Sequence, residues 1–476
     1  MNYDAVIGLE IHVEMKTKSK MFSSAPVEFG AQPNTLVAPL DMAFPGTMPV
    51  VNKQAVINAI RVSNALNMQI DDTLYFDRKN YFYSDLPKGY QITQNARPVG
   101  REGYLDIDTS KGRKHIRIER LHMEEDTCKQ IHFADATLLD YNRAGTPLIE
   151  IVSCPDIRSG EEAMRYVEEI RRIVVYADVS DGKMEEGSLR CDVNISIKPE
   201  GSETLGTKVE IKNLNSIANI EHAINFEIIR QQNVLASGEK IIQETRRFDE
   251  MTRQTVTMRI KTDAVDYKYF TEPNITPIKL SAKFIADAIA SCPELANQKK
   301  DRYVQKYGLV ESDAEKIIAD RSSAFYFDEC AASSKNYSMI KNWLLGDIAG
   351  YLNKNGISLR DFLITPSMLI ELLSMIEKGM ISNKQARDIF AHMAENGTPA
   401  SEAKQKLGIV EQLNDEEAIR KIADQVLNAN AQSIIDYKNG KDRAIGFLVG
   451  QMMKLSGGKA NPSLSNKVLV EELKKR

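Results

Sequence analysis

The period of the hydrophobic residues changes once along this chain, and that change limits the fold more than any single motif does. Up to about Asn274, short runs alternate apolar and polar residues, which is typical of half-buried strands. After Pro273 and Pro277, apolar residues recur at spacings of three and four, which predicts helix after helix. We therefore predict an α+β protein with a strand-rich domain (1–292), an all-α domain (293–407) and a small all-α tail domain (408–476).

Composition excludes several classes of protein. The net charge of −4 over 476 residues argues against nucleic-acid binding by the whole surface, although a local basic patch remains compatible with it. We expect no signal peptide, since residues 1–20 contain only the short apolar stretch "AVIGLEIHV" with acidic neighbours. We also expect no membrane span, since no run of eighteen apolar residues occurs. The five cysteines are scattered without a C-x-x-C pair, which favours reduced thiols in the cytoplasm and disfavours a thiolate zinc site.

Two neighbouring strands carry an unusual polar face. In "LRCDVNISI" (189–197) the odd positions are apolar, and the even ones are Arg190, Asp192, Asn194 and Ser196. A Pro/Gly/Ser-rich connection of hairpin length leads to "TKVEIKN" (207–213), whose polar positions are Lys208, Glu210 and Lys212. Strands joined in this way are expected to be antiparallel neighbours, so that these polar side chains share one face.

Two further segments send acidic residues to one side. "VIGLEIHVE" places Glu10, His12 and Glu14 opposite an apolar row. The segment 117–127 is less regular, and a bulge near Arg120 reconciles its two phases. With that bulge, His122 and Glu124 lie on the polar face. Strand alternation by itself directs the Glu125 side chain to the opposite face. The sequence leaves open which acidic side chain points into the site.

Such a concentration of acids requires a partner of opposite charge. On a single strand, a solvated face with cross-strand ion pairs is the favoured interpretation. Across three or four strands that interpretation weakens, because the carboxylates repel one another without a cation. Carboxylates with an imidazole suit a hard divalent ion such as Mg²⁺ or Mn²⁺. The basic residues Arg190, Lys208 and Lys212 suit an anionic ligand such as a nucleotide phosphate, so we predict an active site on this face.

Other stretches narrow the function. The tyrosine-rich segment 77–94 either packs on the sheet, or lines a pocket or contacts RNA by stacking. The sequence holds no G-x-x-x-x-G-K-[ST] and no G-x-G-x-x-G motif. The Ser–Ser–Lys pattern of amidases is also missing, so any glutamine hydrolysis is expected to occur on another chain.

With these motifs in view, the whole chain resembles the B-type subunit of the bacterial aspartyl/glutamyl-tRNA(Asn/Gln) amidotransferases. The resemblance rests on "GLEIHVEMKTKSKMF", "YFYSDLPKGYQITQ", "HMEEDT", "EEGSLRCDVNISI", "VEIKNLNS", "QETRRFDE" and "DYKYFTEPN", in this order. Asn274 stands where the family usually has an acid, so no role is carried to that position.

The resemblance implies a fold, a reaction and partners. The N-terminal domain is expected to be a catalytic cradle similar to glutamine synthetase and guanidino kinases, with a curved antiparallel sheet that holds ATP and Mg²⁺ (or Mn²⁺). ATP would phosphorylate the side chain of Glu on tRNA(Gln) or of Asp on tRNA(Asn). Ammonia from glutamine, released by an amidase partner subunit, would then displace the phosphate. A small third subunit would complete the enzyme. Which misacylated tRNA predominates depends on the synthetases that coexist with the enzyme.

The family pattern, together with the strand faces, also gives an expected site. The cation ligands are expected to be His12, Glu125, Asp192 and Glu210, with Glu10 and Glu124 close by. The residues expected to act in catalysis are Glu125, Asp192, Arg190, Lys79 and Lys88, and all of these except Asp192 are candidates for the mouth of the ammonia route. Nucleotide phosphates are assigned to Lys208, Lys212 and Arg143, and tRNA phosphates to Lys454, Gly458 and Lys459 in the tail.

Two other classes of function stay open on the sequence. The chain could be a self-contained ATP-dependent amide ligase that uses free ammonia, or a non-catalytic scaffold that binds RNA.

Overall fold

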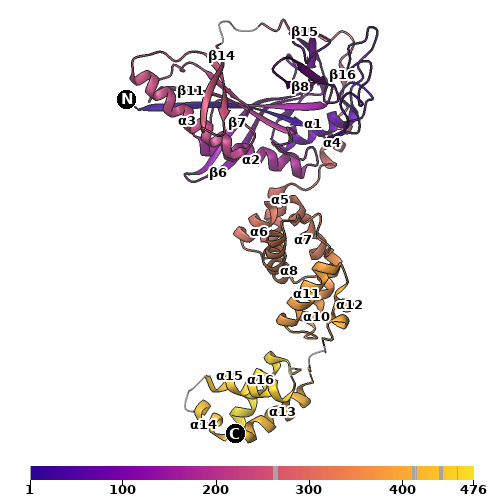
Figure 1. The fold of residues 1–476 in the computed structure, drawn as a ribbon, viewed down its shortest axis with the longest axis vertical. Helices are drawn as coiled ribbons and strands as arrows, with labels where there is room; N and C mark the ends of the chain where they lie inside the picture. Colours follow the sequence, from indigo (N-terminus) through magenta and orange to yellow (C-terminus); the bar gives the residue numbers. More distant parts are fainter. Residues whose placement is uncertain (1, 261–265, 410–412, 414, 439–442, 458) are drawn as a thin grey trace. The chain divides into compact units, whose positions relative to one another are not determined.

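The computed structural model describes residues 2–260, 266–409, 413, 415–438, 443–457 and 459–476 (Figure 1). The chain divides into two compact units, Met1–Ala296 and Asn297–Arg476. The first contains the large sheet and the second is helical, which confirms the predicted α+β class. The further division of the helical part at residue 407 stays a prediction.

The first unit is built on a nine-stranded sheet. In spatial order its strands are β14 (Gln254–Ile260), β13 (Glu244–Asp249), β12 (Val209–Lys212), β11 (Leu189–Pro199), β1 (Tyr3–Glu14), β10 (Pro147–Ser153), β7 (Gly112–Glu125), β6 (Gly100–Thr109) and β2 (Gln69–Ile70). All neighbours pair antiparallel except β12 and β13, which are parallel. The exception arises because helix α3 (Ile217–Ala236) connects these two strands, and a helical crossover returns the chain in the same direction.

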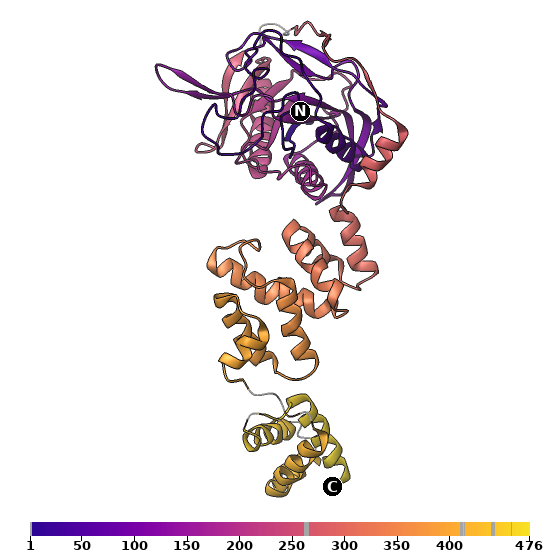
Figure 2. The same cartoon turned by 90° about the vertical axis from the view of Figure 1, so that its right-hand side faces the viewer.

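Helices cover one face of this sheet. α1 (Lys53–Ala65), α2 (Gly160–Tyr176) and α3 pack against strands from β2 to β14, as Figures 1 and 2 show. Helix α2 begins where Ser159 caps the amide of Glu162 and where two glutamates lie in the first turn, which favours the helix dipole. The fully buried Ile7, Leu9 and Ile11 of β1 point into the core beneath the helices. We call the opposite, polar face of the sheet the cradle face.

Smaller elements surround the sheet. They are the sheet β15 (Phe270–Thr271), β4 (Asp77–Asn80) and β5 (Tyr90–Thr93), the pair β16 (Ile278–Lys279) and β3 (Thr73–Leu74), and the hairpin of β8 (Lys129–His132) and β9 (Thr137–Asp140). β5 contacts β7, so the tyrosine-rich segment forms two strands beside the main sheet. The predicted bulge is confirmed, because the β10–β7 register shifts where Val152 faces Arg120 and Ser153 faces Ile118.

The remaining elements are helical. After α4 (Ala282–Ala290) they are α5 (Ala296–Gln305), α6 (Glu311–Ile318), α7 (Arg321–Ser333), α8 (Tyr337–Trp343), a π-helical turn (Leu344–Ile348), α9 (Ala349–Asn355), α10 (Pro366–Glu377), α11 (Asn383–Asn396), α12 (Ala400–Lys406), α13 (Glu416–Ala429), α14 (Ala431–Lys438), α15 (Arg443–Leu455) and α16 (Pro462–Lys475).

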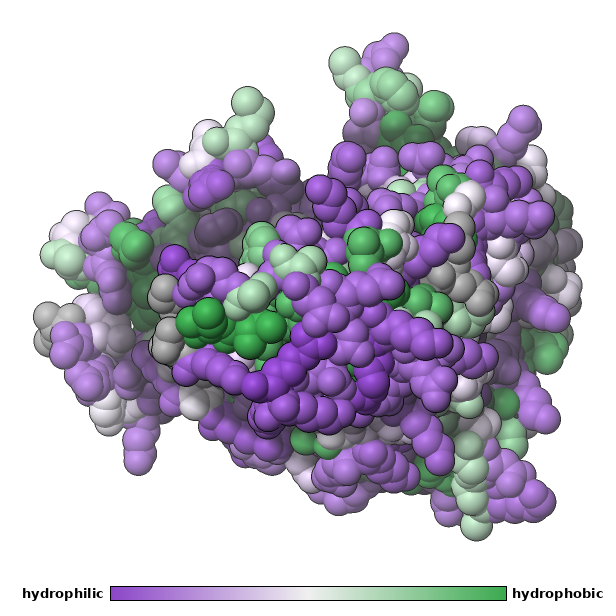
Figure 3. All heavy atoms as spheres, turned by 90° about the horizontal axis from the view of Figure 1, so that it is seen from below, coloured by the Kyte–Doolittle hydropathy of each residue, from purple (hydrophilic) through white to green (hydrophobic). Residues whose placement is uncertain are grey.

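The last four helices share an apolar core of their own. The stripe predicted on α15 is confirmed there, because Leu448 and Met452 are buried and Ile445 and Val449 pack against them. Hydrophilic residues cover most of the surface seen in Figure 3, with groups of hydrophobic residues between them. Among the described residues, none of the helices combines the length and the apolar content that crossing a membrane requires.

Candidate active site

Strand register brings the predicted polar residues together on the cradle face. Glu10 pairs with Asp192 across β1 and β11, and His12 pairs with Arg190. On its other side His12 pairs with Glu150 of β10. The alternation read from the sequence therefore holds through the centre of the sheet, and the polar positions of four adjoining strands converge.

A compact group of possible metal ligands lies at this centre. His12, Glu124 and Glu150 each offer a ligand atom, and these atoms lie within 4.8 Å of one another. Nε2 of His12 is 3.4 Å from Glu150 Oε2 and 3.8 Å from Glu124 Oε1. Nε2 of His122 approaches the same carboxylates at 3.2 and 3.7 Å. We call His12, Glu124 and Glu150 the acidic triad.

The electrostatics of the triad favour positive charge. Burial disfavours the ionised form of Glu150, but the imidazoles of His122 and His12 outweigh it and hold its pKa well below the ordinary value. Burial works against protonation of both histidines, yet Glu150 and Glu124 raise the pKa of His12 and raise that of His122 to about 9. The carboxylates of the triad therefore favour positive charge on the groups beside them.

The two adjacent glutamates of β7 have different surroundings. Glu124 belongs to the triad, whereas Glu125 accepts hydrogen bonds from the Lys88 ammonium and, at 3.0 Å, from the amide of Ile92. Successive side chains on a strand point to opposite faces, so only one of this pair can face the triad. Glu124 therefore faces the triad, and the expected metal-ligating role of Glu125 stays a prediction.

Asp192 and Glu210 share one cation of the protein. The ammonium of Lys212 donates to Asp192 Oδ2 and lies 3.2 Å from Glu210 Oε1. Burial lowers the pKa of Lys212, but these two carboxylates outweigh burial and raise it. Glu10 accepts a hydrogen bond of 2.9 Å from Asn194. These acids lie on the cradle face beside the triad, and their role as metal ligands stays a prediction.

Two predicted arginines gather on an acid that sequence reasoning missed. Arg190 donates to Asp126 Oδ2 at 2.6 Å, and Nε of Arg143 lies 3.6 Å from the same oxygen. Burial raises the pKa of Asp126, but the two guanidinium groups outweigh burial and lower it. Arg143 also donates to the carbonyl groups of residues 127 and 128. Lys208 is exposed and directly precedes β12.

The small sheet places a lysine near the triad. Lys79 of β4 has its ammonium 4.9 Å from the ring centroid of Tyr267. Burial lowers the pKa of Lys79, but Glu124, Tyr269 and Glu150 outweigh burial and raise it. Lys88 precedes β5, and its ammonium lies 5.6 Å from the ring centroid of Tyr90.

Glu150 is the main residue that the sequence did not reveal. The strand "PLIEIVS" reads as a buried strand, and all seven of its residues are buried. The available signal was the acid itself, since an ionised carboxylate inside an apolar strand is costly unless it has a partner. Asp126, the third acid of "HMEEDT", gave a similar signal.

The predicted tail residues are described only in part. Lys454 and Lys459 are exposed at the end of α15 and just after it, and Gly458 lies outside the described residues.

Comparison with known proteins adds an independent observation. The family model for the GatB/GatE catalytic domain matches residues 5–286, and the GatB domain model matches residues 325–473. Proteins named as the B-type subunit of aspartyl/glutamyl-tRNA(Asn/Gln) amidotransferase from Bacillus mycoides (strain KBAB4) and Lysinibacillus sphaericus (strain C3-41) are each 48% identical over 476 residues. The relative from Geobacillus thermodenitrificans (strain NG80-2) is 48% identical over 477 residues. Each comparison covers 100% of both chains. The chain therefore belongs to the family of B-type subunits of the aspartyl/glutamyl-tRNA(Asn/Gln) amidotransferases.

Proposed function

We propose that this chain is the kinase and transamidase subunit of a tRNA-dependent amidotransferase, a carbon–nitrogen ligase that uses glutamine as amide donor. It phosphorylates the side-chain carboxylate of Glu on Glu-tRNA(Gln), or of Asp on Asp-tRNA(Asn), with ATP. Ammonia from an amidase partner then replaces the phosphate. The observation that carries the proposal is the convergence of acids and lysines on one sheet face, in a chain whose full-length relatives carry the amidotransferase name.

The order of the two steps follows from carboxylate chemistry. An unactivated carboxylate is a poor acceptor for ammonia because an oxide would have to leave. Phosphorylation supplies a good leaving group, and fixed positive charge stabilises the phosphoryl group in transfer. The acyl phosphate hydrolyses in bulk water, so ammonia has to arrive by a protected route.

A divalent cation fits the acidic triad. One imidazole and two carboxylates form a donor set that Mg²⁺ and Mn²⁺ accept, and we propose Mg²⁺, with Mn²⁺ as an alternative, on His12, Glu124 and Glu150. The carboxylates of Glu124 and Glu150, which raise the pKa of both histidines, also attract a cation, and this cation would compete with a proton for the imidazole of His12. When bound, the ion would neutralise charge on the transferring phosphoryl group. Glu10, Asp192 and Glu210 extend the acidic surface and complete the proposed cation-binding region.

The lysines of the cradle face supply charge to the phosphates and the substrate. Lys79 is held near Glu124 and Glu150, where an ammonium can neutralise a phosphoryl oxygen. Lys212 orients Asp192 and Glu210 and is available to a phosphate on the same face. Arg143 and Lys208 remain proposed phosphate ligands.

Ammonia is proposed to enter beside the Lys88–Glu125 pair. The Lys88 ammonium pairs with Glu125, and Arg190 donates to the adjacent Asp126, so these groups lie together where β7 ends. A paired ammonium and carboxylate present a polar path without a free nucleophile, and Lys79, which interacts electrostatically with Glu124 and Glu150, is included in the proposed route. An amidase subunit and a small third subunit are the proposed partners.

The tail is proposed to bind tRNA. Lys454 and Lys459 flank the two glycines of "SGGK", which have no side chain to hinder the approach of a phosphate, and Gly458 is included in this proposal. The protein is assigned to the cytoplasm, in accordance with five free thiols.

Reconstitution tests the proposal against both other classes of function. The chain is mixed with its amidase and third subunits, ATP, glutamine and each misacylated tRNA, and Gln-tRNA or Asn-tRNA is measured. Asp192→Ala should abolish phosphorylation while assembly and tRNA affinity persist, and Asp108→Ala, an exposed acid on β6, should behave as wild type. Amidation of a free amino acid with free ammonia by the chain alone would favour the simple ligase. Full activity of Asp192→Ala would reject the catalytic assignment, and a wild-type complex that binds tRNA but is inactive would favour the scaffold.

A further inference from the structure

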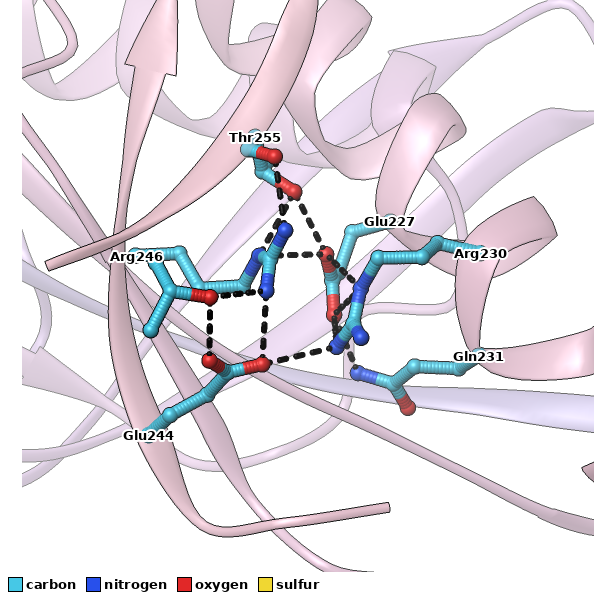
Figure 4. Close-up of polar contacts among 7 residues, drawn as sticks. Glu227, Arg230, Gln231, Glu244, Arg246 and Thr255 are labelled. Atoms are coloured by element: carbon cyan, nitrogen blue, oxygen red, sulfur yellow. Dashed lines mark hydrogen bonds and ion pairs between the residues drawn. The ribbon is translucent and has the colours of Figure 1, made fainter. Parts of the chain in front are cut away.

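The apolar core ends at one edge of the sheet in a buried ionic cluster. On β12 the helix-facing positions are Val209 and Ile211. On β13, the next strand, the residues that point to this same helix-facing side are Glu244 and Arg246. These meet the α3 residues Glu227, Arg230 and Gln231 and the β14 residues Thr255 and Thr257, as Figure 4 shows for six of the seven. We call these seven residues the edge cluster.

Arg246 links the two edge strands to the helix. Its Nη1 donates to Glu244 Oε1 at 2.7 Å and to the Thr257 hydroxyl at 2.8 Å. Its Nε donates to the Thr255 hydroxyl at 2.9 Å, and its Nη2 donates to the Thr255 carbonyl at 2.7 Å. The rigid fork of the guanidinium thus fixes β13 to Thr255 and Thr257, two successive positions on the helix-facing side of β14.

Glu227 completes the cluster from the side of the helix. Its side chain is fully buried and accepts from the Arg230 guanidinium at 2.6–3.1 Å. It also accepts from the Gln231 amide at 2.9 Å and the Thr255 hydroxyl at 2.8 Å. Two carboxylates and two guanidinium groups balance in charge. Buried ion pairs of this kind contribute little net stability, and a specific arrangement is their best-supported use.

The register that the cluster fixes is otherwise weakly specified. β12 and β13 pair only over Glu210–Lys212 and Thr245–Arg247. A slip by one residue on such a short parallel pair would turn every β13 side chain to the opposite face. The β13–β14 register also shifts between Thr245 and Arg246, and bulges near active sites commonly redirect a side chain.

The residue placed by this register is Thr245, which faces the cradle. It is buried, and its hydroxyl donates to Glu210 Oε2 at 2.9 Å. The other carboxylate oxygen, Oε1, lies 3.2 Å from the Lys212 ammonium. Two donors on two strands therefore hold the two oxygens of Glu210 in one orientation.

We propose that Thr245 is a positioning residue for Glu210, and that the edge cluster holds Thr245 in register. This inference rests on the proposed function, since it gives the orientation of Glu210 a purpose in binding the cation. Donors that orient a metal ligand commonly change metal affinity by about 10- to 100-fold when removed.

The test uses Mn²⁺ alone as the probe, titrated into the purified three-subunit complex and followed by electron paramagnetic resonance of the free ion. Thr245→Val should raise the dissociation constant about tenfold with the melting temperature nearly unchanged, and Thr245→Ser should restore binding. Thr204→Val, an exposed threonine between β11 and β12, is the matched control. Glu210→Gln gives the reference loss.

The outcomes separate this inference from the proposed function. If Glu210→Gln weakens Mn²⁺ binding and Thr245→Val does not, the positioning role is wrong while the proposed cation site stands. If Glu210→Gln binds as wild type does, the cation role of Glu210 is wrong and the inference falls with it.

A second pair of variants tests the cluster. Arg246→Lys keeps the positive charge on β13 but loses the several guanidinium hydrogen bonds to Thr255 and Thr257 of β14. This variant should therefore weaken Mn²⁺ binding and lower stability. Arg230→Lys alters the same cluster from the helix side and should lower stability alone. If both variants change stability without changing Mn²⁺ affinity, the cluster has no positioning role.

Discussion

Lys20 and Asp41 form a buried ion pair whose contribution to stability can be measured. Its ammonium is fully buried, lies 3.0 Å from Asp41 Oδ2 and donates to the Tyr141 carbonyl at 3.1 Å. In the Lys20→Met variant the buried Asp41 carboxylate loses its counter-ion and keeps the hydrogen bond from the backbone amide of Ala38. Leaving one buried charge without its counter-ion costs about 3–5 kcal/mol.

This free energy converts into a measurable shift. The unit Met1–Ala296 has an unfolding entropy of about 0.6 kcal/mol per kelvin at the typical value per residue, so Lys20→Met should lower its melting temperature by about 5–8 °C. Differential scanning calorimetry of the full chain measures the shift. Adding Asp41→Leu should recover most of the loss, since an apolar pair of similar volume replaces an ion pair well.

A matched lysine in the same segment gives the control. Lys16 pairs with Asp178 at 3.4 Å, but both side chains are about half exposed, so Lys16→Met should cost about 0–1 kcal/mol. If Lys20→Met and Lys16→Met shift the melting temperature equally, the buried pair is not the constraint inferred from its burial.

Three further outcomes follow from the site and the tail. Glu150→Gln should weaken Mn²⁺ binding to the complex by at least about tenfold, as measured by titration. Glu119 is an exposed acid on the same sheet, so Glu119→Gln should leave Mn²⁺ binding unchanged. Equal affinities of the two variants would exclude Glu150 as a ligand. Deleting residues after 407 should raise the KM for misacylated tRNA and flatten its salt dependence; unchanged tRNA affinity across a salt titration would assign the tail a structural role. The purified chain alone should release no ammonia from glutamine, which a coupled ammonia assay checks, and release without an amidase subunit would contradict the missing serine machinery.

Strand alternation carried most of what the sequence could predict. A period of two set which residues of β1 and β11 share the cradle face, and the phase conflict near Arg120 located the bulge. These features are local, since backbone geometry alone fixes the face to which a side chain points.

The features that sequence analysis missed depend on partners distant in the chain. Glu150 appears as part of an apolar strand until β1 and β7 bring His12 and His122 beside it. The parallel pairing of β12 with β13 depends on where α3 returns the chain, and no period in either strand encodes that. The choice between Glu124 and Glu125 needed the bulge and the position of Lys88 together.

The fate of one oxygen atom tests the central claim most directly. Glu-tRNA(Gln) is prepared with ¹⁸O in the side-chain carboxylate and converted by the three-subunit complex with ATP, Mg²⁺ and glutamine, and the released phosphate is analysed by mass spectrometry. If the cradle face phosphorylates the carboxylate before ammonia attacks, each phosphate carries one ¹⁸O for each Gln-tRNA formed. Glu150→Gln, with the triad broken, should release little labelled phosphate. Formation of Gln-tRNA with phosphate free of ¹⁸O would contradict the proposed reaction.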